Sequence, residues 1–162
     1  MIEVRTTTEL VVTTEHKAGE LARVLGVIAV AGMNVLGYYA YGREGKGVIH
    51  VVAEDPDEAL RHLQQAGLAV TTEEVLLVAK LNHIGSEAGI ARRLGAAGIT
   101  ILYAYATAVE DGRYLSVIKT MDNEAASAAL SGGPAPSRGS GKSDASDESD
   151  PSDTSDTSDK GR

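Results

Sequence analysis

Several residue types that commonly carry function are missing from this sequence of 162 residues, which contains no cysteine, no tryptophan and no phenylalanine. The absence of cysteine excludes a disulfide framework, a thiolate metal site and a cysteine nucleophile. There is no run of eighteen apolar residues either, so we expect no membrane-spanning helix. The N-terminal residues lack the basic stretch and apolar core of a signal peptide, and we therefore expect a cytoplasmic protein.

Positive charge is also scarce. The chain has 15 Lys and Arg residues against 23 Asp and Glu residues, which gives a formal net charge of -8. Because proteins that bind nucleic acids need clustered Lys and Arg side chains, we expect no nucleic acid as a partner. The lack of a long apolar run likewise leads us to expect no membrane as a partner. His16 and His83 lie near glycine turns, but no carboxylate or third histidine stands at ligand spacing from them, so we expect no metal and no cofactor.

Residues 131–162 form an acidic tail with a repeated Ser-Asp pattern and no large apolar side chain. Such a segment cannot bury enough apolar surface to offset the entropy lost on ordering, so we predict that it is disordered. A solubilising role is the simplest interpretation, and a role in multisite phosphorylation or protein interaction is the alternative.

The remaining residues, 1–130, contain an internal repeat. At an offset of 66, with no gap over more than a hundred residues, a set of corresponding positions carries the same residue type. The matching pairs include Gly19 and Gly85, Gly32 and Gly98, Tyr39 and Tyr105, Val51 and Val117, and Glu58 and Glu124. A period of this length indicates a duplicated small domain, because the repeats of solenoid proteins are shorter.

The first copy is predicted to fold as strand, helix, strand, strand, helix, strand. A β-branched run at Leu10–Thr14 predicts the first strand. Apolar residues spaced three and four positions apart between Leu21 and Ile28 predict a helix that ends at Gly32. Two strands at 34–41 and 47–53 follow, then a helix capped by Asp55, and then a strand that runs into the second copy.

The second copy repeats this order but stops early. Its expected elements are strand Val75–Leu81, helix Ser86–Ala97, strands Thr100–Ala106 and Tyr114–Thr120, and helix Asn123–Leu130. It has no fourth strand of its own, which leaves a vacant sheet edge. Either Met1–Arg5, where apolar residues alternate, or a partner chain would fill that edge.

This order of elements is that of the ferredoxin-like fold, a four-stranded antiparallel sheet with two helices on one face. We therefore predict an α+β protein with two ferredoxin-like βαββαβ domains in tandem, domain 1 at residues 1–74 and domain 2 at residues 75–130. The face without helices is expected to be uncovered. Tyrosines cluster in the strands at 34–41 and 100–106 and are expected to form a domain or dimer interface there.

The local motifs of both copies resemble the ACT domain family. In the first copy the motifs are "HKAG" (16–19), "AGMNV" (31–35) and "EDPDEAL" (54–60), and in the second copy "NHIG" (82–85), "AGITI" (97–101) and "ILYAYA" (101–106). The resemblance implies a regulatory module that binds a free amino acid between the first loop of one domain and the second strand of a neighbour. It also implies a homodimer, and an amino-acid metabolic enzyme as a possible partner. Neither loop has the proline that is usual in the family, and Thr100 stands where Asn is common.

The chemistry of the glycine turns supports a ligand site independently of the resemblance. A glycine turn that begins a helix presents free backbone N–H groups, and the helix dipole favours an anion such as an α-carboxylate there. The candidate ligand-binding residues are His16, Lys17, Ala18, Gly19, Glu20, Asn34 and Val35 in the first copy, and Asn82, His83, Ile84, Gly85, Ser86, Thr100 and Ile101 in the second. The favoured arrangement combines the Asn82 loop with Asn34.

We do not expect an enzyme. Enzymes with the same fold hydrolyse acyl phosphates at a site built from an Arg in the first loop and an Asn on the next strand. The first loop of this chain has Lys17 and no Arg. No nucleophile and base are forced together by spacing. The main alternative to an amino-acid-binding regulator is a ligand-free interaction protein, such as the regulatory subunit of an amino-acid metabolic enzyme.

Overall fold

A computed structural model of the chain describes residues 2–108 and 112–132. The elements in chain order are β1 (Ile2–Glu15), α1 (Glu20–Val30), β2 (Val35–Arg43), β3 (Lys46–Ala53), α2 (Pro56–Gln65), β4 (Ala69–Leu81), α3 (Ser86–Ala96), β5 (Ile101–Ala108), β6 (Arg113–Thr120) and α4 (Asn123–Ser131). The predicted order of strands and helices is confirmed in both copies. The predicted disordered tail lies outside the described residues except at its start, where Ser131 belongs to α4.

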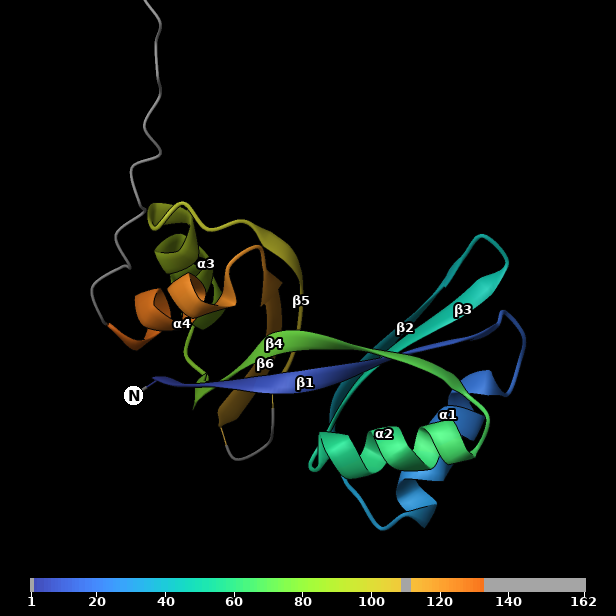
Figure 1. Ribbon diagram of the computed structural model, residues 1–162. Helices are drawn as coiled ribbons and strands as arrows, with labels where there is room; N and C mark the ends of the chain where they lie inside the picture. The colour runs from blue at the N-terminus through green and yellow to red at the C-terminus, as the bar shows by residue number, and fades with distance from the viewer. Residues whose placement is uncertain (1, 109–111, 133–162) are drawn as a thin grey trace, which may run out of the picture.

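Within the described residues the strands form one six-stranded sheet in the order β2-β3-β1-β4-β6-β5. Its centre is the long antiparallel ribbon of β1 and β4, which crosses the middle of Figure 1 with α1 and α2 at one end and α3 and α4 at the other. In this ribbon Thr8 pairs with Glu74, and these two residues are themselves 66 positions apart in the sequence. The two copies are therefore related by an approximate twofold axis through this pair. The α+β fold with two ferredoxin-like halves is confirmed.

The vacant edge of the second half is filled from within the chain. Ile2–Arg5 pairs with Leu77–Lys80 of β4, so the N-terminal part of β1 serves as the fourth strand of the second half; Met1 lies outside the described residues. The first strand is longer than the predicted Leu10–Thr14, because Ile2 and Val4 alternate and pack against the core of the second half. The predicted domain boundary at 74/75 falls inside β4, a strand that runs without a break through both halves.

The prediction of a gapless repeat is wrong beyond the second hairpin. Leu10 pairs with Val51, but its counterpart Leu76 pairs with Ile118, which lies 67 positions after Val51 rather than 66. The helix caps show the same shift, since the counterpart of Asp55 is Asp122. The second β-hairpin therefore contains one extra residue, which the chance matches of valine and glutamate at an offset of 66 conceal.

The helices form as their sequences predict and cover one face of the sheet. The side chain of Asp55 accepts a hydrogen bond of 3.0 Å from the backbone N–H of Glu58, and a proline occupies the first turn of α2. In α1, Val24 and Ile28 are fully buried against the sheet, as their spacing predicts. Each half thus has its own apolar core between its helices and its strands.

The opposite face of the sheet is here called the inner face. It was predicted to be uncovered, but part of it is buried within the chain. The sheet coils so far that its two edge strands approach each other, and a Cβ atom placed on Gly37 of β2 would lie 3.2 Å from the Tyr105 ring on β5. Between these edges lies a third apolar cluster whose buried members are Val52, Val75, Leu77 and Val117. The coiling of a long, twisted sheet, which sequence periodicity does not report, buries this face within one chain.

Candidate functional site

The first glycine turn connects β1 to α1. Gly19 adopts a left-handed conformation (φ 93°) at the N-cap of α1, and no side chain caps the helix, so its first N–H groups remain available to a ligand. A hollow of about 280 Å³ opens beside the turn, between His16 and Lys17 on one side and β2 on the other. The turn therefore combines an uncapped helix start with an adjacent concave surface.

Charged and ring groups hold the first turn in place. The Lys17 Nζ atom donates a hydrogen bond of 2.7 Å to the Glu15 carboxylate, and this contact raises the pKa of Lys17 and lowers the pKa of Glu15. The His16 ring lies directly over Gly42 of β2, where a Cβ atom would overlap the ring. The glycine on β2 thus makes room for a loop residue that the sequence analysis selected as a ligand contact.

The second glycine turn connects β4 to α3 and has the same geometry. Gly85 (φ 81°) is the N-cap of α3, again without a side-chain cap. A hollow of about 410 Å³ is lined by the consecutive residues Asn82–Ala88. The Ser86 hydroxyl accepts a hydrogen bond of 2.9 Å from the His83 N–H, which stabilises the turn. The Lys80 Nζ atom donates a hydrogen bond of 3.2 Å to the Ser86 carbonyl, so its positive charge lies beside the second turn. Lys80 was not among the residues predicted from the sequence.

The predicted strand residues lie at the starts of β2 and β5, away from both turns. Asn34 donates a side-chain hydrogen bond of 3.1 Å to Glu54, and the adjoining Val35 packs against the core of the first half. The Thr100 carbonyl accepts a backbone hydrogen bond of 3.0 Å from Met121, and Ile101 is partly exposed on β5. These four residues therefore stand at the two edges of the sheet.

A single chain does not bring the two glycine turns together. The turns follow the opposite ends of the antiparallel β1–β4 ribbon, whose ladder from Ile2 to Thr13 spans roughly 40 Å at the rise of an extended strand. The hollow beside Asn82 is lined only by its own loop and the start of α3. The combination of the Asn82 loop with Asn34 therefore requires a neighbouring chain, and it stays a prediction.

The inner face carries a polar cluster, here called the Glu9 cluster, made of Glu9, His50, Tyr103 and Tyr105. The Glu9 carboxylate is fully buried and accepts hydrogen bonds from Tyr103 and, at 2.7 Å, from Tyr105; its other close partner is His50 Nδ1, at 2.7 Å. The Tyr39 ring stacks on His50 with ring centroids 4.4 Å apart. The predicted tyrosine interface is thereby confirmed as one between the two halves of the chain.

The electrostatics of this cluster follow from burial and hydrogen bonding. Burial alone would raise the pKa of Glu9, but the hydrogen bonds from His50, Tyr103 and Tyr105 together lower it below its ordinary value. Burial, followed by the bond to Glu9, raises the pKa of both Tyr103 and Tyr105. The site therefore holds a buried carboxylate between two phenol hydroxyls and the His50 ring. Sequence analysis missed Glu9, although an acid at an inner-face position of a β-branched strand is a detectable signal.

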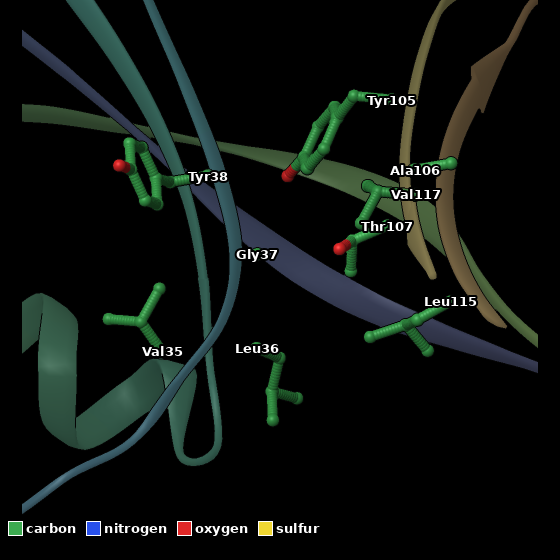
Figure 2. A pocket seen from close by; sticks show the side chains of 9 residues that line it. All are labelled: Val35, Leu36, Gly37, Tyr38, Tyr105, Ala106, Thr107, Leu115 and Val117. Atoms are coloured by element: carbon green, nitrogen blue, oxygen red, sulfur yellow. The ribbon is translucent and has the colours of Figure 1, made fainter. Parts of the chain in front are cut away.

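Beside this cluster the inner face contains a hollow of about 480 Å³ between β2 and β5–β6, shown in Figure 2. Its walls are mostly apolar, with the Tyr38 and Tyr105 rings on opposite sides. Within residues 2–108 and 112–132, no group of three or more His, Asp or Glu side chains is placed to hold a metal ion. None of the helices in the same ranges is long and apolar enough to cross a membrane.

Comparison with known proteins gives one family and one fold. The family model described as an ACT domain pair matches residues 5–130. A solved structure of a Bacteroides thetaiotaomicron protein superposes with a TM-score of 0.73 at 23% identity, covering 80% of this chain and 89% of that chain. The ligand-free regulatory subunit of aspartate kinase from Thermus thermophilus superposes with a TM-score of 0.59 at 14% identity, covering 81% of this chain and 95% of that chain. No curated protein matches the chain.

Proposed function

Because the chain belongs to the ACT domain pair family, whose domains are regulatory amino-acid-binding modules, we propose that it is a regulatory protein that binds a free amino acid at its glycine turns. The observation that carries this proposal is the repeated helix start. Both α1 and α3 begin at a left-handed glycine with no side-chain cap, next to a hollow. Free N–H groups at a helix start and the helix dipole favour an α-carboxylate at each turn.

The two turns are not chemically equivalent. The first offers His16 and a lysine already paired with Glu15, whereas the second offers the Asn82 side chain beside a Ser86 hydroxyl that is bonded within its own turn. Because a side-chain amide both donates and accepts hydrogen bonds, Asn82 makes the second turn better suited to hold both the carboxylate and the amino group of a zwitterion. We therefore assign the tighter site to the Asn82 loop.

A homodimer completes the proposed site. β2 and β5 are the edge strands of the sheet, so among residues 2–108 and 112–132 one side of each has no strand partner. Pairing of these edges between two chains would carry Asn34 or Thr100, at the starts of the edge strands, toward a glycine turn of the other chain. This arrangement would supply a second wall to the hollow beside Asn82, which is lined only by its own loop and the start of α3 in the single chain.

A second candidate function is that of a regulatory subunit for an enzyme of amino-acid metabolism. It is favoured by the aspartate kinase regulatory subunit among the structural relatives, whose length the superposition covers almost completely. The two functions are compatible, because a subunit that binds an amino acid can report its concentration to a catalytic partner. In either case the chain acts by binding rather than by catalysis.

Thermal unfolding with each of the twenty amino acids tests the proposal. A ligand that binds only the native state at a hundredfold excess over its Kd stabilises the protein by about 2.7 kcal/mol. We expect one or a few amino acids to raise the melting temperature, and Asn82→Ala to remove most of that increase. Arg92→Ala, on an exposed face of α3, is the matched control and should keep it. No shift with any amino acid at millimolar concentration would refute the binding function.

A further inference from the structure

We propose that the inner face holds a second ligand site, specific for a free amino acid with an apolar side chain and separate from the glycine turns. Its apolar part is the hollow of about 480 Å³ between β2 and β5–β6 (Figure 2). A smaller hollow of about 170 Å³ shares Leu36 and Leu115 with it and extends to β1 and β4. The pair forms one concave surface in the size range of small-molecule sites.

One wall of the hollow lies at a position where the two copies have diverged. Gly37 of β2 is the counterpart of Tyr103 of β5, since they pair with Val52 and Lys119 at equivalent places in the two ladders. Tyr103 fills its side of the inner face with a ring and reaches Glu9. Gly37 has no side chain, so the Tyr105 ring can approach β2 closely (a Cβ atom on Gly37 would lie 3.2 Å from the ring), and the hollow opens beside this contact.

The residues around the hollow are apolar at the positions where the Glu9 cluster has polar side chains. The repeat places Val75 at the counterpart of Glu9, and the ladders place Val117 at the counterpart of His50. Val117 lines the hollow and is almost fully buried, and Val75 is fully buried next to it. A polar or charged side chain of a ligand would find no hydrogen-bond partner at these two valines. An aliphatic or aromatic side chain would be stabilised there, because it leaves water for an apolar surface.

Two opposite charges stand at the mouth of the smaller hollow. Glu3 and Arg5 are two positions apart on β1, so both side chains project on the inner face, and both line this hollow. Both are exposed, and within the part of the chain that the structure describes neither side chain forms a hydrogen bond or an ion pair. Arg binds carboxylates through paired hydrogen bonds, and a carboxylate is the natural partner of an ammonium group. The two groups match the carboxylate and ammonium of an amino acid.

A small molecule fits this place better than a second protein chain. The apolar residues at the floor of the inner face are already buried within one chain, with Val52 and Val75 at 0% exposure and Leu77 at 4%. The space that remains is a bounded hollow between two strands rather than a broad apolar patch that would drive association. The free charges at one end and the apolar walls at the other select a zwitterion with an apolar side chain.

Methyl NMR of the full chain, titrated with L-leucine, tests the site directly. We expect leucine to shift the methyl signals of Leu36, Leu77 and Leu115, which line the hollows. Leucinamide, which lacks the carboxylate, and 4-methylpentanoate, which lacks the amine, should bind roughly tenfold or more weakly, because each loses a hydrogen bond between charged groups. Arg5→Gln and Glu3→Gln should weaken leucine binding to a similar extent, while Asn82→Ala should leave these methyl shifts unchanged.

The opposite outcomes separate this site from the glycine turns. If leucine shifts only signals of the turns, and Asn82→Ala abolishes those shifts, the inner-face site is refuted while the proposed function stands. If leucinamide and 4-methylpentanoate bind the protein as tightly as leucine does, the site does not recognise an amino acid. The same holds if the Arg5→Gln variant binds leucine as tightly as the unchanged protein does. If the methyl signals of Leu77 and Leu115, which lie on β4 and β6 away from the edge strands, depend on protein concentration without leucine, a second copy occupies the hollows and the proposal fails. Unchanged methyl signals with leucine, phenylalanine and methionine also overturn it.

Discussion

The Tyr105 hydroxyl on β5 donates a hydrogen bond of 2.7 Å to the Glu9 carboxylate on β1, which joins the edge strand of the second half to the central strand of the first. Tyr103 makes a second bond to the same carboxylate, and His50 completes its surroundings. A buried charge is tolerated only when its hydrogen-bonding capacity is satisfied. The Glu9 cluster is therefore the polar contact that fixes how the two halves of the sheet curl toward each other.

Glu9→Leu should destabilise the protein strongly. The change leaves the partly buried Tyr103 and Tyr105 hydroxyls and the buried His50 ring without their acceptor, which costs about 1–3 kcal/mol for each group left unsatisfied. We expect a loss of roughly 3 kcal/mol in the free energy of unfolding, measured by urea denaturation. Glu124→Gln, an exposed change on α4, is the control and should have a small effect. A loss below about 0.5 kcal/mol for Glu9→Leu would contradict the role of the cluster.

Acid should weaken the protein through the same residue. Because the hydrogen bonds hold the pKa of Glu9 below 4.5, its ordinary value, ionised Glu9 contributes stability that is fully present above pH 4.5 and is lost as the pH falls through the folded-state pKa. The free energy of unfolding should therefore decline below about pH 4.5, and Glu9→Gln should show a shallower decline. Equal pH slopes for the two proteins would rule out this assignment.

Alkaline conditions should act through the tyrosines of the inner face. Burial raises the pKa of Tyr39 from 10.0 to about 12, with smaller contributions from Tyr41 and Glu9, and it also raises the pKa of Tyr103 and Tyr105. These protonated phenols contribute stability that is present below pH 10 and is lost as the pH rises through their folded-state values. Phenolate absorbance of this group should appear together with the loss of near-ultraviolet circular dichroism. Phenolate formation near pH 10 by all six tyrosines in a still-folded protein would contradict their burial.

Gly42→Ala should separate binding at the first glycine turn from stability. The added Cβ atom overlaps the His16 ring and displaces it, but His16 is exposed and can move at little cost. We expect a change in unfolding free energy within about 1 kcal/mol and a loss of ligand response at the first turn alone. Calorimetric titration of this variant beside Asn82→Ala provides the measurement. A loss of binding at both turns would show that the effect is not local.

Ser86→Ala should weaken the second turn. Its hydroxyl accepts a hydrogen bond from the His83 N–H and donates one of 3.3 Å to the Leu81 carbonyl, and both are lost in the variant. We expect a destabilisation of about 1 kcal/mol together with weaker amino-acid binding at this turn. Thr71→Ala removes an exposed hydroxyl near the other end of β4, where Thr71 pairs with Val11, and serves as the comparison. Unchanged affinity in Ser86→Ala would argue against a ligand at this helix start.

The sequence predicted the fold well where local rules decide the outcome. The glycine turns, the Asp55 cap and the apolar face of α1 depend on neighbouring residues, and they lie where their spacing places them. The candidate turn residues were likewise visible, because glycine before an amphipathic helix is a local signal. What they bind, and with which neighbour, depends on contacts that no local pattern encodes.

The features that sequence reasoning missed are long-range. Ile2 and Val4 extend β1 because they meet the core of the second half, far along the chain. The burial of Glu9 depends on the coiling of the whole sheet, which places Tyr103 and Tyr105 above it. The extra residue in the second hairpin was hidden by chance matches between residues of the same type, which only strand pairing can distinguish from true correspondence.

Backbone amide NMR during titration with the amino acid that most raises the melting temperature tests the central claim most directly. We predict saturable shifts of the N–H signals that begin α1 and α3, at Glu20 and Leu21 and at Glu87 and Ala88, with larger shifts at the second turn, where the Ser86 N–H already donates to the His83 carbonyl. Saturable binding that leaves both helix starts unshifted would contradict the claim that the glycine turns hold the ligand carboxylate.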